Sequence, residues 1–353
     1  MRLFLFELGK VTENRTKMIK IVSTSKSKDK VQLGDICEYE VIQQKPDVEI
    51  RYFLKQHGIL YLKPLSDWMI QPKIRFFPEA PGKYGLIVQW REPDGSNGWI
   101  EHPFEVTVNA PLSSAPQLVE IDRATHIWVP SQWEANLLRG YEQATFGLLS
   151  KIIKPGWIAY DVGANLGLYS IYFSRAVGNR GHVYCFEANP LCVYFLKANL
   201  EQNRLTNYDI LPVALLDRFQ TSDFTINYGN CGIGLTQKSS FYVSKAGHEI
   251  VVQSDSLDTL IANYNLKKPN LIKIDIEGAE EFAVSGMELT LSRDRPVLLL
   301  EIHGRPAAEK TFQKLEGANY RYQDAASRKE FANVAELLAW FPNTVLQIIG
   351  FPK

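Results

Sequence analysis

The stretch WIAYDVGANLGLYS, residues 157–170, determines the fold that we expect from this chain. It joins a short apolar run, an Asp-x-Gly-x-Asn-x-Gly turn and the start of a helical pattern. Glycines at a strand-to-helix turn permit positive φ angles and let a ligand approach the backbone closely. Asn165 stands at the middle position, and Asn tolerates the left-handed region better than most residues do. We therefore predict a ligand-binding turn at the carboxyl end of a buried strand.

Short apolar runs alternate with helical patterns on both sides of this turn, which is typical of βαβ units and a parallel sheet. We predict a doubly wound, mostly parallel, seven-stranded Rossmann-like α/β sheet in a domain of residues 134–353. Residues 216–255 do not fit a plain crossover, so we expect an insertion there. The predicted strands lie at residues 157–162, 182–188, 208–215, 271–276, 296–302, 319–325 and 343–351.

The preceding part of the chain has a different pattern. Seven short apolar runs separated by turn signals lie between residues 18 and 108, and this spacing favours an all-β immunoglobulin-like sandwich. We expect that domain to span residues 18–110, after a disordered leader at 1–17. The segment NAPLSSAP (109–116) is rich in proline and small residues, so we predict a linker at 111–133.

Composition limits the classes of partner. A chain of 353 residues exceeds the usual size of one hydrophobic core, so two domains are expected. The 39 basic and 39 acidic residues balance, so no net field favours nucleic acid. No apolar stretch reaches the ~20 residues that span a bilayer. The four cysteines form no CxxC pair. We predict a cytoplasmic protein with no nucleic-acid or membrane partner; the sequence does not indicate an oligomeric state.

The turn does not match the dinucleotide fingerprint GxGxxG, because Asn165 and Leu168 occupy two of its glycine positions. A tight turn without a ligand is the alternative interpretation. A second signal favours a ligand: Glu187 ends the next predicted strand, twenty residues after Gly167. An acidic side chain at that place can accept hydrogen bonds from ribose hydroxyls. Asn189 then reads as a helix N-cap.

The third signal is LIKIDIEGAE, residues 271–280. Strand alternation puts Lys273, Asp275 and Glu277 on one face. A strand buried on both faces is normally apolar throughout. Three charges near its carboxyl end therefore indicate either mutual pairing or a site.

The following predicted strand, in PVLLLEIHG, supplies Glu301 and His303 near its own carboxyl end. We predict that these side chains contact an acceptor or act as a general base together with Asp275 and Glu277. Hard oxygen ligands would also suit a divalent cation. Paired or solvated carboxylates explain the same pattern, so the sequence alone predicts no metal site.

Taken in order, DVGANLGLYS, VYCFEANP, LPVALLD, SDSLDTL, LIKIDIEGAE and PVLLLEIHG resemble the FkbM-type methyltransferase family over residues 141–304. The resemblance implies a class I methyltransferase fold, S-adenosylmethionine as cofactor, and O-methylation of a sugar or similar hydroxylated metabolite. It does not cover the predicted sandwich. By position it implies a donor site formed by Asp161, Gly163, Ala164, Asn165, Gly167, Glu187, Ala188, Asn189, Ala214, Leu215 and Asp275. The predicted catalytic residues are Asp275, Glu277, Glu301 and His303.

We therefore expect an S-adenosylmethionine-dependent methyltransferase that modifies a hydroxyl of a saccharide or other small molecule. Two alternatives stay open at this point. One is a nucleotide-dependent enzyme such as an NAD-dependent oxidoreductase, against which the missing fingerprint counts. The other is a non-catalytic protein that binds a glycan or another partner.

Overall fold

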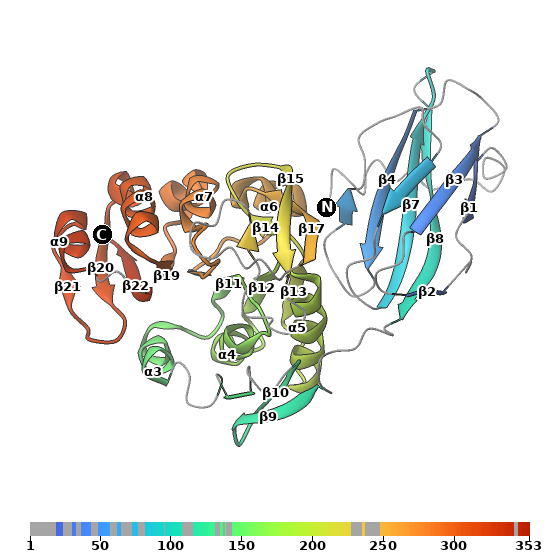
Figure 1. Ribbon diagram of the computed structural model, residues 1–353. Coiled ribbons are helices and arrows are strands. Elements are labelled where there is room, and N and C mark those ends of the chain that lie inside the picture. Colours follow the sequence, from blue (N-terminus) through green and yellow to red (C-terminus); the bar gives the residue numbers. More distant parts are fainter. Residues whose placement is uncertain are drawn as a thin grey trace. The chain divides into compact units, whose positions relative to one another are not determined.

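The computed structural model separates the chain into two compact units, Met1–Pro111 and Leu112–Lys353. The helices and strands of each unit are shown in Figure 1. Among the helices that the structure describes, none has the length and hydropathy needed to cross a bilayer. The structure describes residues 19–23, 30–32, 37–43, 49–56, 62–64, 73–76, 82–94, 96–107, 116–130, 135, 136, 138, 143–226, 235, 236, 248–341 and 345–353.

An eight-stranded sheet forms the centre of the second unit, in the order β13-β12-β11-β18-β19-β22-β20-β21. The first five of these strands pair in parallel, whereas β22 is antiparallel to both of its neighbours. The predicted α/β sheet is thus confirmed, but one further strand, β21, lies at its edge. The strands are β11 (Ile158–Val162), β12 (His182–Phe186), β13 (Tyr208–Leu211), β18 (Leu271–Ile274), β19 (Val297–His303), β20 (Tyr320–Asp324), β21 (Glu330–Phe331) and β22 (Val345–Pro352).

The strand order reverses beside β11. From β11 the chain proceeds outward through β12 to β13 and then returns to β18 on the other side of β11. At such a reversal the connections leave on opposite faces, and a crevice opens at the carboxyl ends of the two central strands. The strand order places the turn after β11 next to the charged end of β18.

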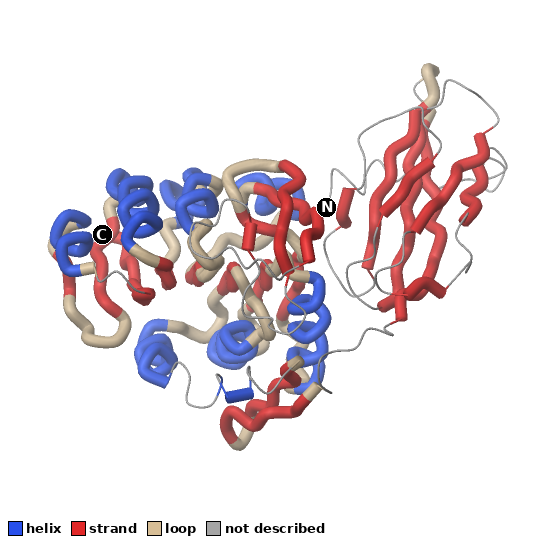
Figure 2. The backbone as a smooth tube through the Cα atoms, viewed as in Figure 1, coloured by secondary structure: helices blue, strands red, loops and turns tan. Residues whose placement is uncertain are grey.

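Helices cover both faces of this sheet (Figure 2), with α4 and α5 on one face and α6, α7 and α8 on the other. As predicted, Asn189 caps α5: it accepts a hydrogen bond from the amide of Leu191, and Pro190 is the first helical residue. The helices are α3 (Gln143–Ile152), α4 (Leu168–Val177), α5 (Pro190–Gln202), α6 (Leu257–Tyr264), α7 (Glu280–Ser285), α8 (Arg305–Leu315) and α9 (Val334–Trp340), with a π-helical turn at Thr290–Asp294 and a 3-10 turn at Glu316–Ala318.

Residues 214–255 carry a small separate sheet, in the order β14-β17-β15-β16. Its two long strands, β15 and β17, pair antiparallel along seven residues of each strand. The insertion expected at 216–255 is therefore built on strands. Its glycine-bearing loop, 229–234, lies outside the described residues. The strands are β14 (Ala214–Leu215), β15 (Gln220–Ile226), β16 (Leu235–Thr236) and β17 (His248–Asp255).

A β-hairpin occupies part of the segment 111–133 that we expected to be a linker. The prediction of a linker is therefore wrong for residues 117–129. The hairpin consists of β9 (Gln117–Asp122) and β10 (Thr125–Val129). Asn199 of α5 completes the backbone hydrogen bonds of Trp128: its Oδ1 accepts from the amide at 2.6 Å, and its Nδ2 donates to the carbonyl at 3.0 Å. The hairpin thus packs on a helix that lies about seventy residues farther along the chain.

Every described element of the first unit is a strand. The strands form two sheets, in the orders β1-β3-β6 and β2-β8-β7-β4-β5. Tyr39, Ile50, Tyr52, Leu86 and Val88 are buried between strands of this unit. The strands are β1 (Ile19–Ser23), β2 (Lys30–Gln32), β3 (Cys37–Gln43), β4 (Glu49–Gln56), β5 (Leu62–Pro64), β6 (Lys73–Phe76), β7 (Gly82–Arg91) and β8 (Asn97–Thr107). The leader expected at 1–17 lies outside the described residues.

Candidate active site

The turn after β11 has the backbone conformation that its sequence indicates. Gly163, Asn165 and Gly167 all have positive φ angles, of 74°, 49° and 91°. A Cβ atom on Gly163 would lie 1.9 Å from the carbonyl oxygen of Asp275, and no real contact is that short. The turn is therefore packed directly against the chain that leaves β18, and only glycine fits at its first position.

Glu187 fixes the other side of this turn. The carboxylate is buried, and its Oε2 accepts a hydrogen bond from the amide of Asn165 at 2.8 Å, while Oε1 accepts one from the amide of Asn189 at 2.7 Å. Burial raises the pKa of Glu187, although the two amide donors oppose that rise. Each carboxylate oxygen has two lone pairs, so both oxygens keep acceptor capacity for a ligand.

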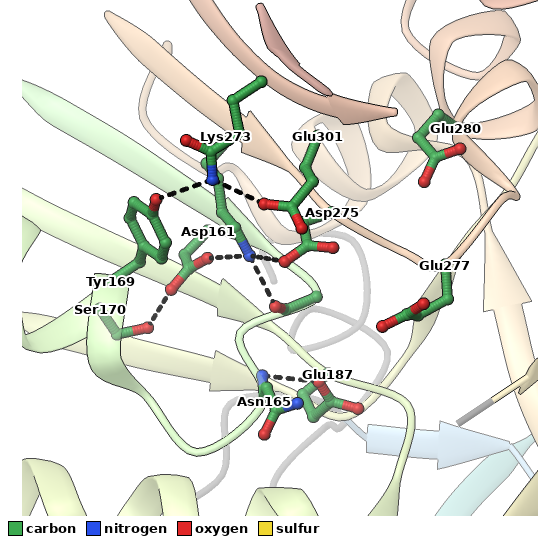
Figure 3. A network of polar contacts seen from close by, with 12 residues as sticks. Asp161, Asn165, Tyr169, Ser170, Glu187, Lys273, Asp275, Glu277, Glu280 and Glu301 are labelled. Atoms are coloured by element: carbon green, nitrogen blue, oxygen red, sulfur yellow. Dashed lines mark hydrogen bonds and ion pairs between the residues drawn. The ribbon is translucent and has the colours of Figure 1, made fainter. Parts of the chain in front are cut away.

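Lys273 connects the turn with β18 (Figure 3). Its Nζ donates to the carbonyl of Gly163 at 2.9 Å and lies 3.2 Å from Oδ2 of Asp275 and 3.4 Å from Oδ1 of Asp161. Burial alone would lower the pKa of Lys273, but the carboxylates of Asp275 and Asp161 outweigh burial and raise it. The lysine is thus a buried cation shared by two strands.

Asp161 lies behind the turn. Its side chain has no exposed surface, and Oδ2 accepts a hydrogen bond from Oγ of Ser170 at 2.6 Å. Burial raises the pKa of Asp161, with the Lys273 charge opposing the rise. In the structure this predicted donor residue therefore contacts the start of α4 and the buried lysine.

A second group of charged side chains, which we call the His303 cluster, consists of His303, Asp275, Glu277, Glu280 and Glu301. Nδ1 of His303 lies 3.1 Å from Oε1 of Glu280. Its Nε2 lies 3.4 Å from Glu277, 3.8 Å from Glu301 and 3.9 Å from Asp275. The four predicted catalytic residues are therefore brought together.

Electrostatics within the His303 cluster are unusual. Burial raises the pKa of Glu277 to about 7 and that of Glu301 to about 7, and the Asp275 charge adds to both rises. Burial would lower the pKa of His303, but its hydrogen bond to Glu280 and the surrounding carboxylates raise it to about 9. Perturbed groups of this kind gather at functional sites more often than elsewhere.

Three members of the site were not identified from the sequence. Glu280 is fully buried, and its Oε1 also accepts a hydrogen bond from the amide of Gly278 at 2.9 Å. Gln347 of β22 donates from Nε2 to Oε2 of Glu301 at 2.6 Å, and its own Oε1 accepts from the hydroxyl of Thr145 at 2.6 Å. Only the alternation of β22 could have indicated Gln347, and no motif indicated Thr145.

The remaining predicted donor residues lie in the turn, directly after Glu187, or in the small sheet. Ala164 is buried in the turn, and Ala188 and Asn189 follow Glu187 directly. Ala214 and Leu215 form β14, which pairs with β17 of the small sheet rather than with the central one. The turn and the His303 cluster share Asp275, so both lie at the carboxyl ends of the parallel strands in the central sheet.

A central sheet with this order, an Asp-x-Gly-x-Asn-x-Gly turn after its first strand and an acid at the end of the next define a class I S-adenosylmethionine-dependent methyltransferase domain. Residues 161–322 match the family model described as the methyltransferase FkbM domain. This part of the chain is thus an FkbM methyltransferase domain. The match confirms the predicted family and the predicted cofactor, and it favours methyl transfer over hydride transfer.

Two methyltransferases share sequence similarity with the chain. The hexuronic acid methyltransferase AglP of Haloferax volcanii is 27% identical over 193 residues, which cover 54% of this chain and 75% of that protein. The methyltransferase sdnD of Sordaria araneosa is 25% identical over 205 residues, covering 50% of this chain and 78% of that protein.

Solved structures are more distant. Methyltransferase FkbM from Methylobacillus flagellatus is 12% identical, with a TM-score of 0.34, and covers 63% of this chain and 61% of its own. A SAM-dependent methyltransferase from Aquifex aeolicus is 13% identical, with a TM-score of 0.36, and covers 62% of this chain and 97% of its own.

Proposed function

We propose that this protein transfers the methyl group of S-adenosylmethionine to a hydroxyl oxygen of a saccharide. The observation that carries the proposal is the sharing of Asp275 by the turn after β11 and the His303 cluster. A donor held in the turn would have its reactive end beside a group of side chains that can accept a proton. The hexuronic acid methyltransferase from Haloferax volcanii supports a sugar acceptor.

The residues beside Glu187 suit the nucleoside part of the cofactor. Glu187 has acceptor capacity for ribose hydroxyls, as its geometry indicates. Next to it, Nδ2 of Asn189 is buried and has no partner among the described residues, although its Oδ1 caps α5. A buried donor without a partner is costly, and a ligand acceptor would satisfy it. When bound, the cofactor supplies an electrophilic methyl group.

We assign the role of general base to Glu301. An alcohol must lose its proton as it attacks a methyl group, and a positioned base contributes to the rate. Gln347 holds Oε2 of Glu301 and is itself held by Thr145, so the carboxylate has a fixed orientation. Its other oxygen, Oε1, faces His303 within the cluster. Such alignment of base and substrate lowers the entropic part of the barrier.

We propose an accessory role for the first unit. The order of its two sheets is compatible with an immunoglobulin-like arrangement. In that assignment β1, β3 and β6 are strands A, B and E of one sheet. The other sheet then has β8, β7, β4 and β5 as strands G, F, C and C′. We propose such a sandwich for residues 18–110, in front of the methyltransferase domain. A cytoplasmic location stays a prediction.

The test combines donor binding and turnover. Isothermal calorimetry with S-adenosylmethionine should show binding, and transfer of a labelled methyl group should be found within a panel of hexuronic acids, neutral sugars and short oligosaccharides. Glu301→Gln should lower kcat by about 10²–10⁴-fold and leave the Kd for the cofactor unchanged. Glu281→Gln is the matched control, because Glu281 pairs with Lys310 outside the His303 cluster.

Two results would contradict the proposal. One is the absence of cofactor binding by the unmodified protein. The other is a Glu301→Gln variant with the turnover of the control. If binding occurs but only non-saccharide hydroxyl compounds are methylated, the acceptor class is wrong and the methyltransferase activity stands.

A further inference from the structure

Three side chains of the His303 cluster converge on one point. Asp275, Glu277 and His303 each offer one metal-ligating atom, and these atoms lie within 4.8 Å of one another. Asp275 follows β18, Glu277 lies in the next loop and His303 ends β19. The backbone of Glu277 has a φ angle of 54°, which is unfavourable for a residue other than glycine or asparagine. The fold therefore holds this carboxylate in place at a cost in strain.

A buried carboxylate orients the imidazole. Nδ1 of His303 faces Oε1 of Glu280, and a carboxylate there requires a proton on Nδ1. In the neutral ring, Nε2 is then the lone-pair atom, and it is the atom that faces Asp275 and Glu277. Histidine ligands of metals commonly have such a carboxylate behind them. The other oxygen of Glu280, Oε2, is fully buried and has no partner among the described residues.

The local charge balance is negative. Among the described residues around β18 and the end of β19, five carboxylates meet two cations, Lys273 and His303. Lys273 is already engaged by Asp161, Asp275 and the Gly163 carbonyl. Asp161 and Glu280 are fully buried, whereas Asp275, Glu277 and Glu301 are partly exposed. Carboxylates withdrawn from water are costly unless they are paired or bind a metal. A cation beside Glu277 and Asp275 would compensate this charge better than the imidazolium alone.

We propose that Asp275, Glu277 and His303 bind one divalent cation of the manganese type. Carboxylates suit Mg²⁺, Ca²⁺ and Mn²⁺, while imidazole suits transition metals, so Mn²⁺ fits both kinds of ligand. Three protein ligands leave coordination positions for a substrate. Resting on the function proposed above, this cation would receive the oxygen atoms of the saccharide acceptor. The sequence alone predicted no metal, because the carboxylate of Glu280 lies behind His303 only in the folded structure.

The experiment uses the full chain, freed of metal with a chelator and titrated with MnCl₂ while free Mn²⁺ is followed by electron paramagnetic resonance. One Mn²⁺ should bind per chain. Asp275→Asn, Glu277→Gln and His303→Gln should each abolish binding, and Glu280→Gln should weaken it by about 10–100-fold. Glu281→Gln should bind Mn²⁺ as the unmodified protein does, because it removes one negative charge from the same helix without touching the site.

The cofactor provides an independent readout for Glu277→Gln, His303→Gln and Glu280→Gln. Asp275→Asn also changes the ion pair with Lys273 beside the donor turn, so thermal unfolding alone reports whether that variant is folded. Calorimetric binding of S-adenosylmethionine and thermal unfolding show whether a variant is folded. If the unmodified protein binds the cofactor but no Mn²⁺, the metal site is refuted and the methyltransferase proposal stands. Mn²⁺ binding that persists in both His303→Gln and Glu280→Gln would also refute it. Where a ligand variant does not fold, the result for the unmodified protein together with Glu280→Gln decides.

Discussion

At Gly163 the backbone conformation and the packing both require glycine. Its φ angle is positive, and its missing side chain leaves room for the carbonyl of Asp275. The side chain of Asp275 also pairs with the buried Lys273 and belongs to the His303 cluster. A change at Gly163 would therefore displace the donor turn and the proposed catalytic group together.

Gly163→Ala should lower the free energy of unfolding by at least about 1–3 kcal/mol, because both the φ angle and the contact with Asp275 become unfavourable. It should also weaken binding of S-adenosylmethionine. Urea unfolding and calorimetry measure the two effects. Gly147→Ala is the control: Gly147 lies inside α3 with no neighbouring atom within 4 Å of an added Cβ. That variant should be stabilised by about 0.5–1 kcal/mol, and equal losses in both variants would contradict the argument.

At this scale the sequence indicated which residue types form the site, but not how each is used. The positive φ angles of the turn followed from glycine and asparagine chemistry, and the structure has them. Glu280 could not be predicted as a partner of His303, because an acidic residue in a first helical turn ordinarily stabilises the helix dipole. Its burial depends on how α7 packs beside β19, which no local pattern encodes.

Among the elements, the β9–β10 hairpin is attached to the donor turn through one side chain. Asn199 binds both backbone groups of Trp128 and also donates from Nδ2 to the carbonyl of Leu166 in the turn at 2.8 Å. Asn203, one helical turn later, binds both backbone groups of His126 but not the turn. The two asparagines thus hold adjacent parts of β10 and differ in their contact with the donor site.

Asn199→Ala should destabilise the domain by about 1–3 kcal/mol, since it leaves the buried carbonyl of Leu166 and the part-buried backbone groups of Trp128 without this partner. It should also weaken cofactor binding, whereas Asn203→Ala should loosen the hairpin with little effect on the cofactor. Hydrogen exchange at the amides of Trp128 and His126 measures the first effect, and calorimetry measures the second. An unchanged Kd for S-adenosylmethionine in Asn199→Ala would show that the turn does not depend on this contact.

The elements that the sequence predicted share one property: their pattern is local. The strands of the central sheet are short apolar runs beside turn signals, and all seven predicted ones occur in the structure. The strands of the hairpin at 117–129 pair with each other, but β10 is also held by side chains of the distant helix α5, and no local pattern indicates that packing. Likewise, β21 has only two residues, which is too short for any alternation to be recognised.

For the whole molecule, the division into two units leads to a prediction about their independence. The described residues of the donor turn and of the His303 cluster all belong to Leu112–Lys353. We expect a fragment of residues 112–353 to fold and to bind S-adenosylmethionine with the Kd of the full chain. Circular dichroism and calorimetry test this. A fragment that is folded but does not bind the cofactor would show that the first unit contributes to the donor site.

The place of β22 has a consequence for synthesis. Along the chain it follows β20 and β21, yet it lies between β19 and β20 in the sheet. A nascent chain leaving the ribosome can pair β11, β12, β18 and β19 at once, while the edge of β19 stays open until residues 345–352 emerge. Open strand edges invite aggregation, so this stage is where chaperones would matter most. Gln347 arrives with β22, so the donor turn can form before Glu301 receives the partner that orients it.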